Sequence, residues 1–176
     1  MEQIKKNIDV AMGRIKADLV LKNARFINVF TENVDRGDIA IVDDTIIGIG
    51  NYSGSVEIDC SDLYVAPGFI DAHVHIESSM IMPKQFGEVV IKKGITTVIA
   101  DPHEIANVEG NNGVKAMIES SKEAPIDIFF MLPSCVPATQ FEDSGYVLNA
   151  EDLEELIDNK CEIGRASCRE RVFAGC

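Results

Sequence analysis

The fold is decided by residues 67–77, which read Pro67-Gly68-Phe69-Ile70-Asp71-Ala72-His73-Val74-His75-Ile76-Glu77. The Pro-Gly pair is typical of a turn, and the apolar and polar residues after it alternate as in a short β-strand. Side chains two residues apart lie on the same face of a strand. We therefore expect Asp71, His73 and His75 to share one face, with Glu77 as a further candidate.

Two histidines on one strand face can bind one metal ion. Residues two apart are separated by about 7 Å along a strand, so both imidazoles can reach a single divalent cation. The alternative is a pair of surface histidines, because an H-x-H pattern also arises by chance. The chain has three His, all between His73 and His103, and two of them belong to this pattern. The sequence therefore favours a metal site.

Composition excludes several other classes of protein. The chain has 176 residues and a net charge of -13, which disfavours binding to nucleic acid or to anionic lipid. Its N-terminus leads into no apolar signal segment, and its longest aliphatic and aromatic run, residues 128–132, is far too short to span a membrane. Five Cys without a C-x-x-C pair indicate free thiols in a reducing compartment. We expect a cytoplasmic protein.

The first 66 residues predict a small domain without catalytic chemistry. Apolar residues at helical spacing predict an amphipathic helix over residues 2–16. Short β-rich runs follow, and Asp43-Asp44 is typical of a tight hairpin turn. The runs are residues 19–21, 25–30, 38–42, 45–49 and 56–59. We expect a small antiparallel β unit in which the acidic residues form a solvated face.

After Pro67 the pattern changes to strands that alternate with helices. The expected strands are residues 70–75, 95–100 and 126–132, and the expected helices are residues 83–93, 112–123 and 150–157. Pro83 suits the first turn of its helix, Gly94 suits its C-terminal cap, and Asn149 suits an N-cap. Three strand-helix units in series predict an α/β fold with a parallel sheet and right-handed crossovers.

Chemically versatile residues lie at or just after the C-terminal end of each expected strand. These residues are His73 and His75, then His103 and Glu104, then Ser134 and Cys135. A (β/α)8 barrel places its active site at the C-terminal ends of its strands. The pattern therefore predicts one shared site.

The C-terminal stretch, residues 164–176, differs from the rest of the chain. It contains three Arg and one Glu, a net charge of +2, and shows neither helical nor strand periodicity. A basic functional tail is one interpretation. We favour a non-native junction that replaces the true continuation, so the expected domains are residues 1–66, 67–163 and this tail.

Four motifs carry a resemblance to a known family. Residues 67–75 resemble the metal-binding strand that opens the barrel of the amidohydrolase superfamily. Residues 77–80, 96–108 and 129–139 resemble the bacterial adenine deaminases within it, and the likeness extends from about residue 17 to residue 160. The resemblance implies the N-terminal part of a (β/α)8 amidohydrolase barrel, preceded by a small β-sandwich portion. The barrel would be incomplete, with three or four of its eight units.

The resemblance also implies an activity and a site. The activity is hydrolytic deamination of adenine to hypoxanthine and ammonia by a metal-activated hydroxide, in a homo-oligomer when full length. The implied cofactor is a divalent metal, with Mn²⁺ favoured and Fe²⁺ or Zn²⁺ as alternatives. His73 and His75 would bind the metal, and Asp71 would hold a histidine or the strand end in place. His103 would be a catalytic residue or a further ligand, and Ser134 and Cys135 would line the substrate pocket.

Other interpretations stay open. The full-length protein could be another cyclic amidohydrolase of the dihydroorotase or hydantoinase type. The chain alone could be an inactive metal-binding fragment, because the bridging carboxylate, later His ligands and catalytic Asp of the family do not follow. A different class of zinc deaminase carries H-x-E with a later P-C-x-x-C. His75-Ile76-Glu77 fits the first part, but the absence of P-C-x-x-C excludes that class.

Overall fold

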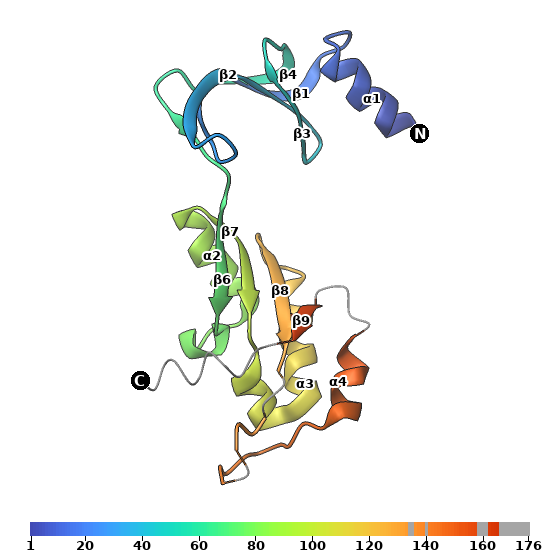
Figure 1. Ribbon diagram of the computed structural model, residues 1–176, viewed down its shortest axis with the longest axis vertical. Helices are drawn as coiled ribbons and strands as arrows, with labels where there is room; N and C mark the ends of the chain where they lie inside the picture. The colour runs from blue at the N-terminus through green and yellow to red at the C-terminus, as the bar shows by residue number, and fades with distance from the viewer. Residues whose placement is uncertain (134–135, 140, 158–161, 166–176) are drawn as a thin grey trace. The chain divides into compact units, whose positions relative to one another are not determined.

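A computed structural model describes the chain except for residues 134–135, 140, 158–161 and 166–176. It divides into two compact units, Met1–Pro67 and Gly68–Cys176 (Figure 1). The expected site residues Ser134 and Cys135 lie outside the described residues, as does most of the expected tail. All three His belong to the second unit.

The first unit begins with a helix shorter than the sequence predicts. Helix α1 spans Glu2–Ala11, so the prediction of a helix over residues 2–16 is wrong beyond residue 11. Gly13 ends it with a positive φ of 66°, a conformation that costs glycine little. The amide of Gly13 donates to the carbonyl of Val10, and that of Arg14 donates to Asp9. This is a Schellman motif, which overrides the apolar periodicity that continues to Ile15.

The sheet of the first unit is mixed. Its strands are β1 (Ala17–Asn28), β2 (Asn33–Val42), β3 (Thr45–Gly50), β4 (Gly54–Asp59) and β5 (Tyr64–Val65). Strands β1, β2 and β3 pair antiparallel, and the hairpin turn at Asp43 and Asp44 is confirmed. The prediction of a wholly antiparallel unit is wrong, because β4 and β5 pair with β1 in parallel. The chain crosses from β3 at one edge to β4 on the far side of β1, and residue alternation alone carries no strand direction.

The second unit contains the predicted parallel sheet. Strands β6 (Phe69–Val74), β7 (Ile95–Ala100), β8 (Asp127–Leu132) and β9 (Glu162–Arg165) lie in that order, and each pairs in parallel with its neighbour (Figure 1). Their carboxyl ends therefore meet at one edge of the sheet. Strand β9 includes Gly164 and Arg165, so the prediction that residues 164–176 lack regular structure is wrong for these two.

The helices of the second unit mostly follow the prediction. Helix α2 (Pro83–Val90) begins at Pro83, and the short 3-10 helix Ile91–Lys93 after it ends at Gly94, which has a φ of 84°. Helix α4 spans Ala150–Ile157. Its N-terminus is closed by a reciprocal pair of hydrogen bonds in which Asn149 and Asp152 each accept from the other's backbone amide, at 3.1 and 3.0 Å.

Helix α3 begins much earlier than predicted. It spans His103–Ser121, whereas the sequence predicts residues 112–123. Gly110 interrupts it with φ 56° and ψ -143°, a region that essentially only glycine occupies. The kink hides the first turns from a periodicity search. The correction places His103 and Glu104 in the first turn of a helix rather than in a loop.

The core of the second unit lies between the sheet and its helices. Val98 of β7, Phe130 of β8, Val114 of α3 and Leu156 of α4 are almost fully buried within it. Burial of such side chains contributes about 1.5–3 kcal/mol each. By contrast, Phe69 and Ile70 of β6 are exposed. Among the residues that the structure describes, no helix is long and apolar enough to cross a bilayer.

Candidate metal centre

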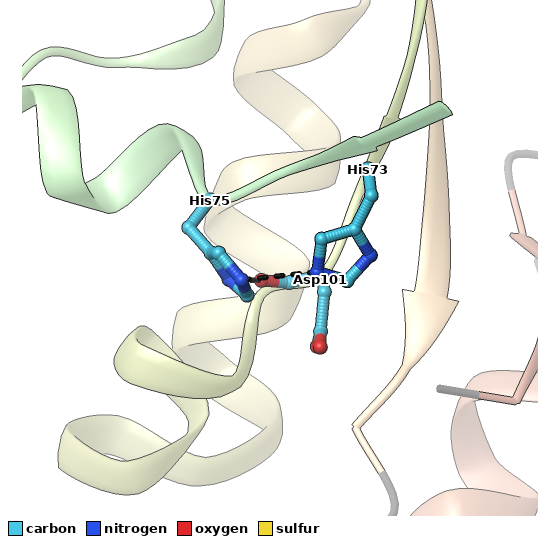
Figure 2. A group of neighbouring side chains, drawn as sticks. All are labelled: His73, His75 and Asp101. Carbon is cyan, nitrogen blue, oxygen red and sulfur yellow. Dashed lines mark hydrogen bonds between the residues drawn. The ribbon is translucent and has the colours of Figure 1, made fainter. Parts of the chain in front are cut away.

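The two histidines of the H-x-H pattern converge on one point. Strand β6 ends at Val74, and His75 follows in an extended conformation, so both side chains leave the same end of the strand. Their Nε2 atoms lie 3.1 Å apart (Figure 2). The strand geometry expected from the sequence is therefore confirmed, although the metal-binding role of the pair stays a prediction.

The other ring nitrogen of His75 is held by the backbone. Its Nδ1 lies 3.1 Å from the carbonyl oxygen of Asp101, which can only accept a hydrogen bond. We therefore assign the proton of a neutral His75 to Nδ1. Its Nε2 then presents a lone pair toward His73, and this is the arrangement that orients a metal-binding imidazole.

Asp101 is the third donor, and the sequence prediction missed it. It follows β7 directly, its side chain is buried, and it groups with His73 and His75 (Figure 2). Its backbone amide donates to the carbonyl oxygen of Val74 at 3.0 Å, which ties the ends of β6 and β7 together. Its Oδ1 is buried and has no hydrogen-bond partner among the described residues. The sequence could have indicated Asp101 by its position, because it directly follows the buried strand that pairs with the strand of the histidines.

His103 and Glu104 complete the cluster. The Nδ1 of His103 lies 3.1 Å from Oδ2 of Asp101, and its ring meets the His75 ring edge to face with centroids 4.7 Å apart. Glu104 Oε2 lies 3.3 Å from His75 Nδ1. His75, His103 and Glu104 also form a group of potential metal ligands. The structure thus brings His103 into contact with His75 and Asp101, and its catalytic role stays a prediction.

Two further acidic residues support these elements. Asp71 accepts a hydrogen bond from the backbone amide of His73 at 3.2 Å, so it braces the strand end. Glu77 does not share the strand face that the sequence suggested, because it lies in the 3-10 helix Ile76–Ser79. Burial raises the pKa of Glu77, and the charge of Glu104 raises it further.

The donor set fits a divalent cation. Zinc binds imidazole nitrogen at about 2.0–2.1 Å in tetrahedral geometry, which places two such nitrogens roughly 3.3 Å apart. The observed 3.1 Å separation of the two Nε2 atoms is close to this value. The buried Asp101 Oδ1 without a hydrogen-bond partner is the kind of atom that a cation satisfies. Imidazole and carboxylate donors do not distinguish Zn²⁺ from Mn²⁺ or Fe²⁺.

Residues 64–171 match the family described as "Amidohydrolase family". The chain belongs to the amidohydrolase family. This family is metal-dependent, in agreement with the His, His and Asp group at the strand ends.

Curated relatives match most of the chain. The adenine deaminase of Clostridium acetobutylicum is 60% identical over 161 residues, which cover 92% of this chain and 28% of that protein. The adenine deaminase of Geobacillus kaustophilus is 50% identical over 159 residues, 90% of this chain and 28% of that protein. The chain therefore spans a little over a quarter of the length of these relatives.

Solved structures share the fold at low sequence identity. A zinc complex of the atrazine chlorohydrolase from Arthrobacter aurescens TC1 is 16% identical with a TM-score of 0.61, covering 84% of this chain and 46% of that one. The N-acyl-D-glutamate deacylase from Bordetella bronchiseptica, complexed with zinc and a phosphonate inhibitor, is 20% identical with a TM-score of 0.55. That match covers 82% of this chain and 35% of the deacylase. These likenesses support the fold alone.

Proposed function

We propose that this chain is the N-terminal part of a metal-dependent adenine deaminase. The observation that carries the proposal is the His73, His75 and Asp101 cluster, within a chain that is 60% identical to a curated adenine deaminase. We further propose that β6 to β9 are the first four strands of a (β/α)8 barrel. The first unit would then be part of a small β-sandwich domain.

The cluster suits hydrolytic deamination. A divalent cation held by His73, His75 and Asp101 would lower the pKa of a coordinated water to about 7, so that hydroxide is available at neutral pH. His75 holds its lone pair toward the site because its Nδ1 proton is fixed on the Asp101 carbonyl. His103, in contact with Asp101 and His75, is placed to move a proton to the amine that leaves C6 of adenine.

The chain alone should not turn over adenine. The described donors come from the ends of two strands, β6 and β7, and the first turn of α3. Three donors leave a cation weakly held, and Asp101 is already shared with His103. We expect Mn²⁺ to bind the 176-residue chain without ammonia release.

A hybrid enzyme tests the proposal. The aligned segment of the Clostridium acetobutylicum adenine deaminase is replaced by the matching 161 residues of this chain. With Mn²⁺ the hybrid should release ammonia from adenine, and its His75→Ala variant should fall to the background of the assay. Glu88→Ala, which removes an exposed carboxylate on α2, is the matched control and should keep the activity.

Two outcomes would contradict the proposal. A correctly folded hybrid that hydrolyses dihydroorotate or hydantoin but not adenine would assign the segment to the cyclic amidohydrolases instead. Turnover of adenine that survives His75→Ala with unchanged metal content would remove this cluster from the reaction.

A further inference from the structure

Glu77 connects the end of β6 to helix α3, two of the three elements that carry residues of the candidate metal centre. It lies in the 3-10 helix Ile76–Ser79, directly after His75. Its Oε1 accepts a hydrogen bond from the backbone amide of Ile105 at 3.3 Å, and Ile105 is in the first turn of α3. Its Oε2 is buried and has no hydrogen-bond partner among the described residues. The side chain thus reaches from the end of β6 to the start of the helix that follows β7.

Helix α3 lacks an N-cap of its own. The first amides of a helix have no partner within it, and a Ser, Thr, Asp or Asn side chain at the N-cap ordinarily accepts from one of them. The N-cap residue of α3 is Pro102, whose side chain has no acceptor, and no side-chain cap is formed there. Glu77 accepts from the third residue of the helix, the amide that a local cap uses. A carboxylate is also favoured at this end of the helix dipole.

The first turn of α3 carries two members of the cluster. His103 and Glu104 are its first two residues, and they contact Asp101 and His75 at 3.1 and 3.3 Å. The position of this turn therefore sets the distance of both side chains from the histidine pair. A displacement of about 1 Å in a supporting element is enough to cost activity.

We propose that Glu77 is a positioning residue that caps α3 from outside the helix. Through this cap it fixes His103 and Glu104 against His75 and Asp101. The claim on turnover rests on the proposed function, whereas the claim on the cap does not. A direct role of Oε2 toward a cation or substrate is the competing outcome, and it is separable because Gln keeps the acceptor oxygen and removes the charge.

The cap is tested by hydrogen exchange at the Ile105 amide in the full 176-residue chain, without metal or substrate. Glu77→Ala should raise the exchange rate of this amide by roughly 3- to 30-fold, the range that loss of a cap produces. Glu77→Gln should stay within about 3-fold of the wild type, because a Gln carbonyl still accepts the bond. Glu88→Ala should leave the rate unchanged. An unchanged rate in Glu77→Ala would overturn the proposal.

The positioning role is tested in the hybrid enzyme. Glu77→Ala should lower kcat by about 10-fold or more with little change in KM, and Glu77→Gln should restore most of kcat. If Glu77→Ala fails to fold, Glu77→Asp replaces it, because Asp keeps the charge but withdraws the acceptor from Ile105. A Gln variant as impaired as Ala, with normal exchange at Ile105, would assign Glu77 a direct role and overturn the proposal. A wild-type hybrid without activity would count against the proposed function alone, since the exchange experiment still decides the cap.

Discussion

Among the described residues, each of the two units contains one deeply buried aspartate, and the two differ in their contacts. Asp38 in the first unit and Asp101 in the second are 6% and 7% exposed. Asp38 accepts from Lys22 Nζ at 2.5 Å and from the amides of Asn23 and Tyr52, so both its oxygens are satisfied. Asp101 contacts His103 through Oδ2, while its buried Oδ1 has no hydrogen-bond partner among the described residues.

The difference distinguishes a structural carboxylate from a candidate metal ligand. Burial of an unsatisfied oxygen costs about 1–3 kcal/mol, so it persists where something other than stability retains it. Both carboxylate oxygens of Asp38 already accept hydrogen bonds, so neither is left for a ligand or cation to satisfy. Asp101 keeps one buried oxygen without a hydrogen-bond partner among the described residues, and its carboxylate lies within 4.8 Å of nitrogens of His73 and His75.

The largest expected effect follows from Asp101→Asn. The substitution removes the charge that a cation would meet, and we expect affinity for Mn²⁺ to fall by about 10- to 100-fold or more. Isothermal titration of the full chain with Mn²⁺ measures this change. Asp38→Asn is the control and should leave the affinity unchanged. An equal loss of Mn²⁺ affinity in the two variants would contradict the different roles that we assign to Asp38 and Asp101.

The second effect is on stability and is confined to the first unit. Asp38 is buried and both its oxygens accept hydrogen bonds, whereas the Nδ2 of Asn cannot accept one. We therefore expect Asp38→Asn to lower the free energy of unfolding by about 1–3 kcal/mol. Hydrogen exchange of the amides in β1 and β2 follows this unit by itself. Asp62→Asn, at an exposed position in the same unit, should change little. Unaltered exchange in Asp38→Asn would show that the network is not structural.

The same aspartate predicts a pH dependence. Burial raises the pKa of Asp38, but the hydrogen bonds from Lys22, Asn23 and Tyr52 outweigh it, and the net pKa lies below the ordinary value. The stabilisation is therefore complete above an ordinary pKa of about 3.9 and is lost as pH falls through the lower folded value. Urea unfolding between pH 3 and 6 measures the free energy of unfolding of the wild type and of Asp38→Asn. The difference between the two values should become smaller toward pH 3. A difference that becomes larger toward pH 3 would contradict the lowered pKa of Asp38.

The smallest effect is expected from breaking an exposed ion pair. Lys84 and Glu123 form an exposed ion pair at 2.6 Å on the second unit, and surface pairs of this kind contribute little. The Lys84 partner holds the pKa of Glu123 below its ordinary value. We expect Lys84→Ala to shift neither the thermal midpoint nor the Mn²⁺ affinity measurably. A clear shift in either quantity would mean that exposure is a poor guide to the role of a charge in this chain.

Sequence reasoning found the parts of the molecule that local rules determine. Alternation around His73 predicted the strand and the convergence of the histidines, and Pro83, Gly94 and Asn149 marked helix ends correctly. The order of strands and helices predicted the parallel sheet. Each of these features depends on residues that are neighbours along the chain.

Two misses, the end of α1 and the start of α3, come from the local backbone of Gly13 and Gly110. The other misses depend on contacts between distant residues. The parallel pairing of β4 with β1 joins segments on either side of a hairpin. The first turns of α3 are capped by Glu77, which is 28 residues away in sequence. Asp101 becomes a candidate ligand only when β7 lies beside β6, and a carboxylate in a chain with 29 acidic residues gives no signal by itself.

The central claim is that His73 and His75 bind one cation together. Electron spin-echo envelope modulation of Mn²⁺ bound to the full chain measures it directly, because each coordinated imidazole nitrogen adds a resolvable coupling. We predict couplings from two imidazoles, with one lost in His73→Ala and one lost in His75→Ala. Bound Mn²⁺ without nitrogen coupling, or with couplings that survive both substitutions, would contradict the account.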